Sequence, residues 1–116
     1  MRRRLLPAAL ATIVLAVGAW VALAPSATAA SSVTIGLRSF AISKSVSSVP
    51  HGTVTFKLVN KGKLMHDFKI SGKKSKLISP GKSGRLIVTL KKGKLSYLCT
   101  VAGHAAAGMK GKLTVT

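Results

Sequence analysis

Short β-prone runs separated by clusters of Gly, Pro, Ser and Lys make up the sequence beyond residue 30. Turn signals at such close spacing are typical of an all-β sandwich or barrel. No segment carries a sustained helical period, which argues against an α or α/β class. The candidate strands are residues 32–37, 53–60, 64–71, 75–78, 84–91, 95–100 and 110–115. We therefore expect an all-β fold with one core.

The first 30 residues differ in character from the rest of the chain. Arginines at positions 2–4 precede an apolar stretch at 5–24, and Ala-Thr-Ala at 27–29 supplies a small-x-small cleavage signal. This pattern predicts a signal peptide over residues 1–30 and an exported domain over residues 31–116. The domain would reside in the periplasm, at the cell surface or outside the cell. The alternative is an uncleaved membrane anchor, because about 20 apolar residues can span a bilayer.

The expected domain is strongly basic. Without the three arginines of the leader it has 16 Lys and Arg against a single Asp, a formal net charge of +15. Such a charge attracts anionic partners, so we expect an acidic protein or an anionic envelope surface as the partner. The domain is expected to be a monomer. Nucleic acid is not expected as a partner, because the four aromatic residues of the domain lie in strand patterns rather than on a stacking platform.

Cys99 is the only cysteine, so the domain cannot form an internal disulfide. A buried, inert cysteine that acts as a small hydrophobe is one interpretation. Metal coordination is another, and it also explains the neighbours, because Cys99 opens the run Cys-x4-His-x4-Met that contains His104 and Met109. Gly103 and Gly108 would let this loop curl tightly enough for three side chains to point at one centre.

His66 is the upstream candidate for the same site. Strand alternation places it on an apolar face with Phe68, as it places Cys99 with Tyr97, so the two could converge at one end of a sandwich. One thiolate, two imidazoles and a weak thioether favour a single copper ion of the blue electron-transfer type. Structural zinc would need a fourth strong ligand. The remaining histidine, His51, lies in a Pro-His-Gly turn and is interpreted as a turn residue.

Two segments resemble the cupredoxins, small blue-copper proteins of the plastocyanin and azurin type. Residues 97–104, continued through Met109 to residues 111–115, resemble the C-terminal ligand loop of that family. Residues 54–62, followed by His-Asp-Phe at 66–68, resemble the segment that carries the first histidine ligand. The four-and-four loop spacing is similar to auracyanin and rusticyanin rather than to plastocyanin. The resemblance implies a Greek-key β-sandwich.

The resemblance also implies a role for each candidate ligand. His66, Cys99 and His104 would be the strong trigonal ligands, and Met109 the long axial one. The ring edge of His104 would reach the surface as the port for electrons, and an acidic redox protein would dock near it. The expected docking patch is formed by Met65, Ala105, Ala106 and Ala107.

Asp67, the sole acidic residue, follows the first histidine, at a position where cupredoxins commonly have Asn or Ser. It would accept a hydrogen bond from the hydroxyl or the backbone amide of Thr100; the alternative is a solvated carboxylate that softens the local positive charge. A carboxylate this close would favour Cu(II) over Cu(I).

The expected function is that of an exported carrier of single electrons, with copper alternating between Cu(I) and Cu(II). The alternative is a copper-binding carrier or buffer that exchanges the metal, and a third interpretation is a cationic surface-binding protein that uses copper for stability. An enzyme is not expected, because catalytic copper needs an open position or further histidines and the chain has only three.

Overall fold

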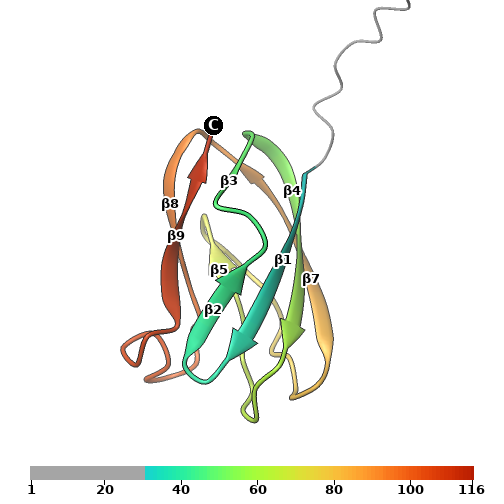
Figure 1. The fold of residues 1–116 in the computed structure, drawn as a ribbon, viewed down its shortest axis with the longest axis vertical. Helices are drawn as coiled ribbons and strands as arrows, with labels where there is room; N and C mark the ends of the chain where they lie inside the picture. Colours follow the sequence, from blue (N-terminus) through green and yellow to red (C-terminus); the bar gives the residue numbers. More distant parts are fainter. Residues whose placement is uncertain (1–30) are drawn as a thin grey trace, which may run out of the picture.

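The structure is a computed structural model that describes residues 31–116 of the chain. These residues form nine strands in two β-sheets that pack face to face (Figure 1). The first sheet has the order β2 (Ala41–Lys44), β1 (Ser31–Arg38), β4 (Gly52–Asn60), β7 (Ser83–Leu90). The second has the order β3 (Ser48–Val49), β9 (Lys110–Val115), β8 (Gly93–Leu98), β5 (Lys69–Ile70), β6 (Lys73–Lys74). The expected all-β sandwich is confirmed.

Both sheets mix parallel and antiparallel pairs, and the chain crosses repeatedly between them. β1 pairs parallel with β4 and β3 pairs parallel with β9, whereas the other pairs are antiparallel. Neighbouring strands such as β1 and β4, or β4 and β7, are therefore not consecutive in sequence, as the expected Greek-key arrangement requires. The crossovers leave several long loops at one end of the sandwich, drawn at the bottom of Figure 1.

The core follows the alternation of side chains along the strands. In β4, Val54, Phe56 and Leu58 are fully buried, whereas the intervening residues face outward. Across the interface, Phe68 lies with its ring centroid 5.1 Å from that of Phe56, which joins the two sheets. Burial of each large apolar side chain contributes about 1.5–3 kcal/mol relative to exposure, and this core fixes the frame from which the end loops project.

Four predicted strands, at residues 32–37, 53–60, 84–91 and 110–115, agree with β1, β4, β7 and β9 to within one residue at each end. β2, β3 and β6 were not predicted. The prediction of one strand over residues 64–71 was wrong, because only Lys69–Ile70 is a strand there. The predicted strand at 75–78 is also absent among the described residues, where the segment forms a loop.

The segment that carries His66 is a loop rather than a strand because side-chain hydrogen bonds occupy its backbone, as described below. The predicted strand at 95–100 is shifted: β8 is Gly93–Leu98, so Cys99 lies directly beyond the end of that strand. The leader predicted over residues 1–30 lies outside the described residues. Within residues 31–116, no helix is long and apolar enough to cross a membrane.

Candidate metal centre

Three buried metal-ligating side chains meet at the loop end of the sandwich. His66 lies between β4 and β5, Cys99 directly follows β8, and His104 lies in the β8–β9 loop. The two Nδ1 atoms are 3.1 Å apart, and Cys99 Sγ lies 4.0 Å from Nδ1 of His66 and 3.7 Å from Nδ1 of His104. Donors about 2.0–2.3 Å from a shared ion lie about 3–4 Å from one another. The spacing therefore fits one metal ion.

The β8–β9 loop closes on itself through its own backbone. Cys99 N donates to Met109 O at 3.0 Å, and Met109 N donates to His104 O at 3.0 Å. Gly103 and Gly108 have φ angles of 81° and 126°, which residues other than glycine rarely adopt. The predicted tight curl of the loop is confirmed. The loop brings the thiol, an imidazole and the fully buried Met109 to the same end of the core.

Asn60 holds the segment that carries His66, and the sequence analysis missed it. Its Nδ2 donates to the carbonyls of Leu64 and Ile78 at 2.8 Å each, and its Oδ1 accepts from Gly62 N at 2.9 Å. His66 and Ile78 also exchange backbone hydrogen bonds of 3.2 and 2.8 Å. The alternation of side chains along β4 could have revealed this role, because it places Asn60 on the buried face of the strand, where an amide is unusual.

Asp67 joins the two ligand-bearing segments. The side chain is buried, its Oδ1 accepts from Thr100 N at 2.6 Å, and its Oδ2 accepts from the Thr100 hydroxyl. The expected link to Thr100 is confirmed, and the alternative of a solvated carboxylate is wrong. Because Asp67 follows His66 and Thr100 follows Cys99, these two bonds fix the relative position of two donors.

Comparison with known proteins assigns the chain to a family. Residues 11–115 match the family model of the cupredoxin-like domain. The chain is a cupredoxin. A search of curated proteins found no match.

Solved structures of auracyanins share the fold of this cupredoxin. Reduced auracyanin from Roseiflexus castenholzii has a TM-score of 0.67 at 23% identity, over 75% of this chain and 98% of that chain. Auracyanin B gives 0.66 at 22%, over 75% and 89% of the two chains. Auracyanin A from Chloroflexus aurantiacus, described as a "blue" copper protein, gives 0.63 at 21%, over 73% and 98%. The similarity to auracyanin inferred from the loop spacing extends to the fold.

The donor set fits a single type 1 copper ion. The ligating atoms of His66, Cys99 and His104 all lie within 4.8 Å of one another, and no carboxylate belongs to the cluster. A soft thiolate with two imidazoles suits copper, and the buried thioether of Met109, attached to the same loop, is a weak further donor. These four residues would hold the ion.

Burial controls the protonation of the donors in the metal-free cupredoxin. It raises the pKa of the Cys99 thiol, an effect that backbone hydrogen bonds oppose. It also lowers the pKa of His66, and the neighbouring His104 lowers that pKa further while Asp67 raises it. His66 is therefore kept neutral, as a ligand must be, whereas the thiol must lose its proton when a metal binds.

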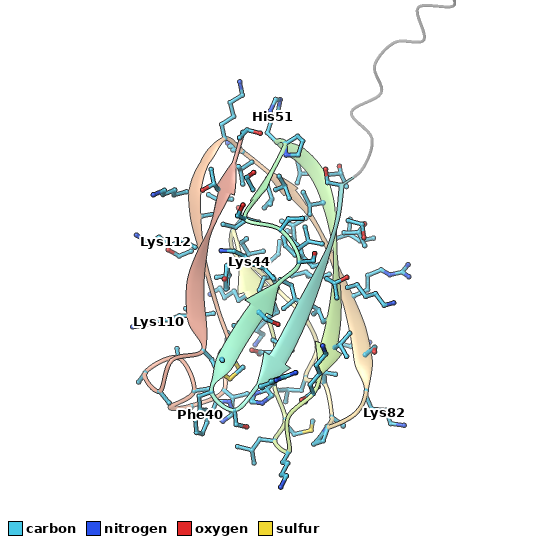
Figure 2. All side chains as sticks on the ribbon, viewed as in Figure 1. Phe40, Lys44, His51, Lys82, Lys110 and Lys112 are labelled. Carbon is cyan, nitrogen blue, oxygen red and sulfur yellow. The ribbon has the colours of Figure 1, made fainter. Side chains whose placement is uncertain are left out.

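Two residues of the β1–β2 turn contact the ligands, and neither was among the predicted site residues. The Phe40 ring packs edge-on against the His104 ring, with centroids 5.1 Å apart, and lies at the loop end of the sandwich (Figure 2). Ser39 Oγ lies 3.4 Å from Nε2 of His66. His104 is 8% exposed, whereas His66 and Cys99 are fully buried, so the expectation that its ring edge reaches the surface stays a prediction. Phe40 is more exposed, at 43%.

The apolar surface at this end differs from the expected docking patch, because Ala105 is half-buried whereas Phe40 and Leu64 are exposed. Leu64 and Met65 are 44% and 41% exposed, and Ala106 and Ala107 are exposed as well. We call Phe40, Leu64, Met65, Ala106 and Ala107 together the apolar end patch. His51, by contrast, lies at the opposite end of the sandwich, where its Nδ1 is 3.2 Å from Thr116 O (Figure 2). Its interpretation as a turn residue away from the cluster agrees with that position.

Proposed function

We propose that this cupredoxin is an exported carrier of single electrons, with His66, Cys99, His104 and Met109 as the ligands of one copper ion. When bound, copper supplies the chemistry by alternating between Cu(I) and Cu(II). The observation that carries the proposal is the convergence of three buried donors from two segments of the chain, the loop that carries His66 and the β8–β9 loop. Their spacing and their neutral or thiolate chemistry are what a mononuclear copper site needs.

The surrounding residues support electron transfer because they hold the donors still. Asp67 fixes the segment that carries His66 to the segment that carries Cys99. Asn60 fixes the His66 segment to the core. Donors that cannot move between oxidation states keep the reorganisation small. Burial of His66 and Cys99 at 0% exposure also keeps water away from the centre, which leaves no open position for a substrate and argues against an enzyme.

Electrons would enter and leave through the apolar end patch. Phe40 is exposed and packs edge-on against His104, so a partner that docks on this patch would contact Phe40 beside that ligand. The net charge of +15 over residues 31–116 favours an acidic redox protein, or an anionic envelope surface, as the partner of a monomeric carrier.

The competing function, a copper carrier or buffer, requires a metal that exchanges readily. Burial of the donors opposes rapid exchange. The test follows the copper-loaded chain in two ways: voltammetry should show a reversible one-electron wave, and a strong copper chelator should remove the metal slowly. Release of copper within the mixing time, together with an irreversible wave, would favour the copper carrier and refute the electron carrier.

A further inference from the structure

A cleft of about 570 Å³ opens along one side of the sandwich, and none of its lining residues belongs to the apolar end patch. It lies between β6 and β7, the last strands of the two sheets, where no strand bridges them. Four of its lining residues are cations: Lys74, Lys76, Lys82 and Arg85. Lys82 projects into solvent at the turn before β7 (Figure 2). The cleft is therefore a concentrated positive site, not a neutral crevice.

Like charges also face each other across the strands that border the cleft. Lys57 of β4 pairs directly with Arg85 of β7, and Lys69 of β5 pairs directly with Lys74 of β6. A smaller hollow of about 260 Å³, lined in part by Lys57 and Arg85, adjoins the cleft. Cations directly opposite one another destabilise a sheet, so these pairs oppose folding unless an anion neutralises them.

The chain has no side chain with which to neutralise them. Its only acidic residue is Asp67, which is buried and bonded to Thr100 at the metal centre. Counter-charge for the cleft must come from outside. Across protein interfaces a positive patch commonly meets a negative one, so this cleft suits an anionic partner.

The walls of the cleft also contain aliphatic surface. Leu77 is 58% exposed, and Leu86 is half-buried beside it. A phosphate polymer would neutralise the cations but leave these side chains in water, and a flat membrane surface cannot enter a concave cleft. A peptide can cover both, and β7 offers it one unpaired strand edge for backbone hydrogen bonds.

We propose that the cleft between β6 and β7 binds an acidic polypeptide segment of a partner protein. Its carboxylates would pair with the cations at Lys74, Lys76, Lys82 and Arg85, and its apolar side chains would cover Leu77 and Leu86. The segment would hold the partner through residues that do not belong to the apolar end patch.

The cleft is also joined directly to the metal centre. Ile78 lines it, and the backbone of Ile78 exchanges two hydrogen bonds with His66. A partner held in the cleft is thus positioned against the segment that carries one proposed ligand. This last step rests on the proposed electron transfer, whereas binding of the peptide does not.

The test measures binding of a short fluorescent peptide of alternating Glu and Leu to the full chain, by anisotropy at low salt. One variant combines Lys76→Gln, Lys82→Gln and Arg85→Gln. Its matched control combines Lys91→Gln, Lys92→Gln and Lys94→Gln, which remove the same charge where β7 connects to β8, at the other end of the sandwich. We expect the first variant to lose about tenfold or more in affinity and the control to lose little.

Equal losses in the two variants would show an effect of net charge alone and overturn the proposal. So would equal binding of a Gln-Leu peptide, or tighter binding of inorganic polyphosphate than of the acidic peptide. Amide chemical shifts locate the peptide independently: changes at Ile78 and Ser83–Leu86 support the cleft, and changes confined to the apolar end patch refute it. Because anisotropy and shifts do not depend on colour or potential, failure here is distinguishable from failure of the proposed copper function.

Discussion

The single carboxylate of the chain allows the electrostatics of the site to be tested with one atom changed. In Asp67→Asn, the amide oxygen can still accept from Thr100 N, and the amide nitrogen can donate to the Thr100 hydroxyl, so both links survive with one direction reversed. The substitution therefore removes a negative charge and leaves the frame in place. Because that charge favours Cu(II) over Cu(I), we expect the reduction potential to rise.

The size of the rise follows from the geometry. Asp67 Oδ1 lies 2.6 Å from Thr100 N, and the bonds from that nitrogen back to Cys99 Sγ limit the carboxylate–sulfur separation to roughly 9 Å. A unit charge at this upper limit is worth about 1.8 kcal/mol at an effective dielectric constant of ~20, and a shorter separation makes the effect larger. For a one-electron couple, where ~59 mV corresponds to ~1.4 kcal/mol, this is about 80 mV.

Protein-film voltammetry of the copper-loaded wild type and variant measures the shift. Lys91→Gln is the control, because it changes the charge of an exposed residue on the far connection between β7 and β8 and should leave the potential nearly unchanged. An unchanged or lower potential in Asp67→Asn, with the absorption spectrum preserved, would refute the assigned electrostatic role of the carboxylate.

Three further predictions concern the frame and the protonation of the donors. Asn60→Ala removes three hydrogen bonds at a buried residue and should lower the free energy of unfolding by about 2–4 kcal/mol, measured by denaturant titration. Gly111→Ala would place a Cβ 2.6 Å from Tyr97 Cζ and should cost about 1–3 kcal/mol in the same assay. In the metal-free protein, the free energy of unfolding should fall at both ends of the pH range. Because folding lowers the pKa of His66, stability should fall as the pH drops below the ordinary histidine value of 6.5. Because folding raises the pKa of Cys99, stability should fall again as the pH rises above the ordinary thiol value of 9.0.

Control variants distinguish these specific effects from a general loss of stability. Thr53→Ala, at an exposed position of β4, should change stability by less than about 0.5 kcal/mol, and a similar small effect in Asn60→Ala would contradict the role of that amide. In a Tyr97→Ala background the cost of Gly111→Ala should vanish; a persistent cost would place its origin elsewhere. Cys99→Ala should abolish the loss of stability at alkaline pH and leave the loss at acidic pH. An unchanged pH profile would exclude the thiol as the cause of the alkaline loss.

Local pattern and chemistry were sufficient to predict much of the site. The Cys-x4-His-x4-Met spacing and its two glycines predicted a curled loop, because φ angles and ligand chemistry are encoded within a few residues. Strand alternation predicted the buried face of β4. The link from Asp67 to Thr100 was expected from the resemblance to cupredoxins, and the structure confirms it.

The errors arose where distant residues determine the conformation. The segment around His66 has the alternation of a strand, but Asn60 binds the carbonyls of Leu64 and Ile78 and keeps it a loop. Phe40 covers His104 because the β1–β2 turn reaches the end of the sandwich beside the β8–β9 loop. Neither contact follows from local periodicity, since each depends on how the two sheets are stacked.

The central claim is that Cys99, as a thiolate, binds a single copper ion together with His66 and His104. The most direct measurement is the visible absorption spectrum of the chain after one equivalent of Cu(II) is added, compared with that of Cys99→Ser. We predict an intense blue thiolate-to-copper band in the wild type, complete at one equivalent and absent from the variant. A pale complex in the wild type, or a band that survives in Cys99→Ser, would contradict the account.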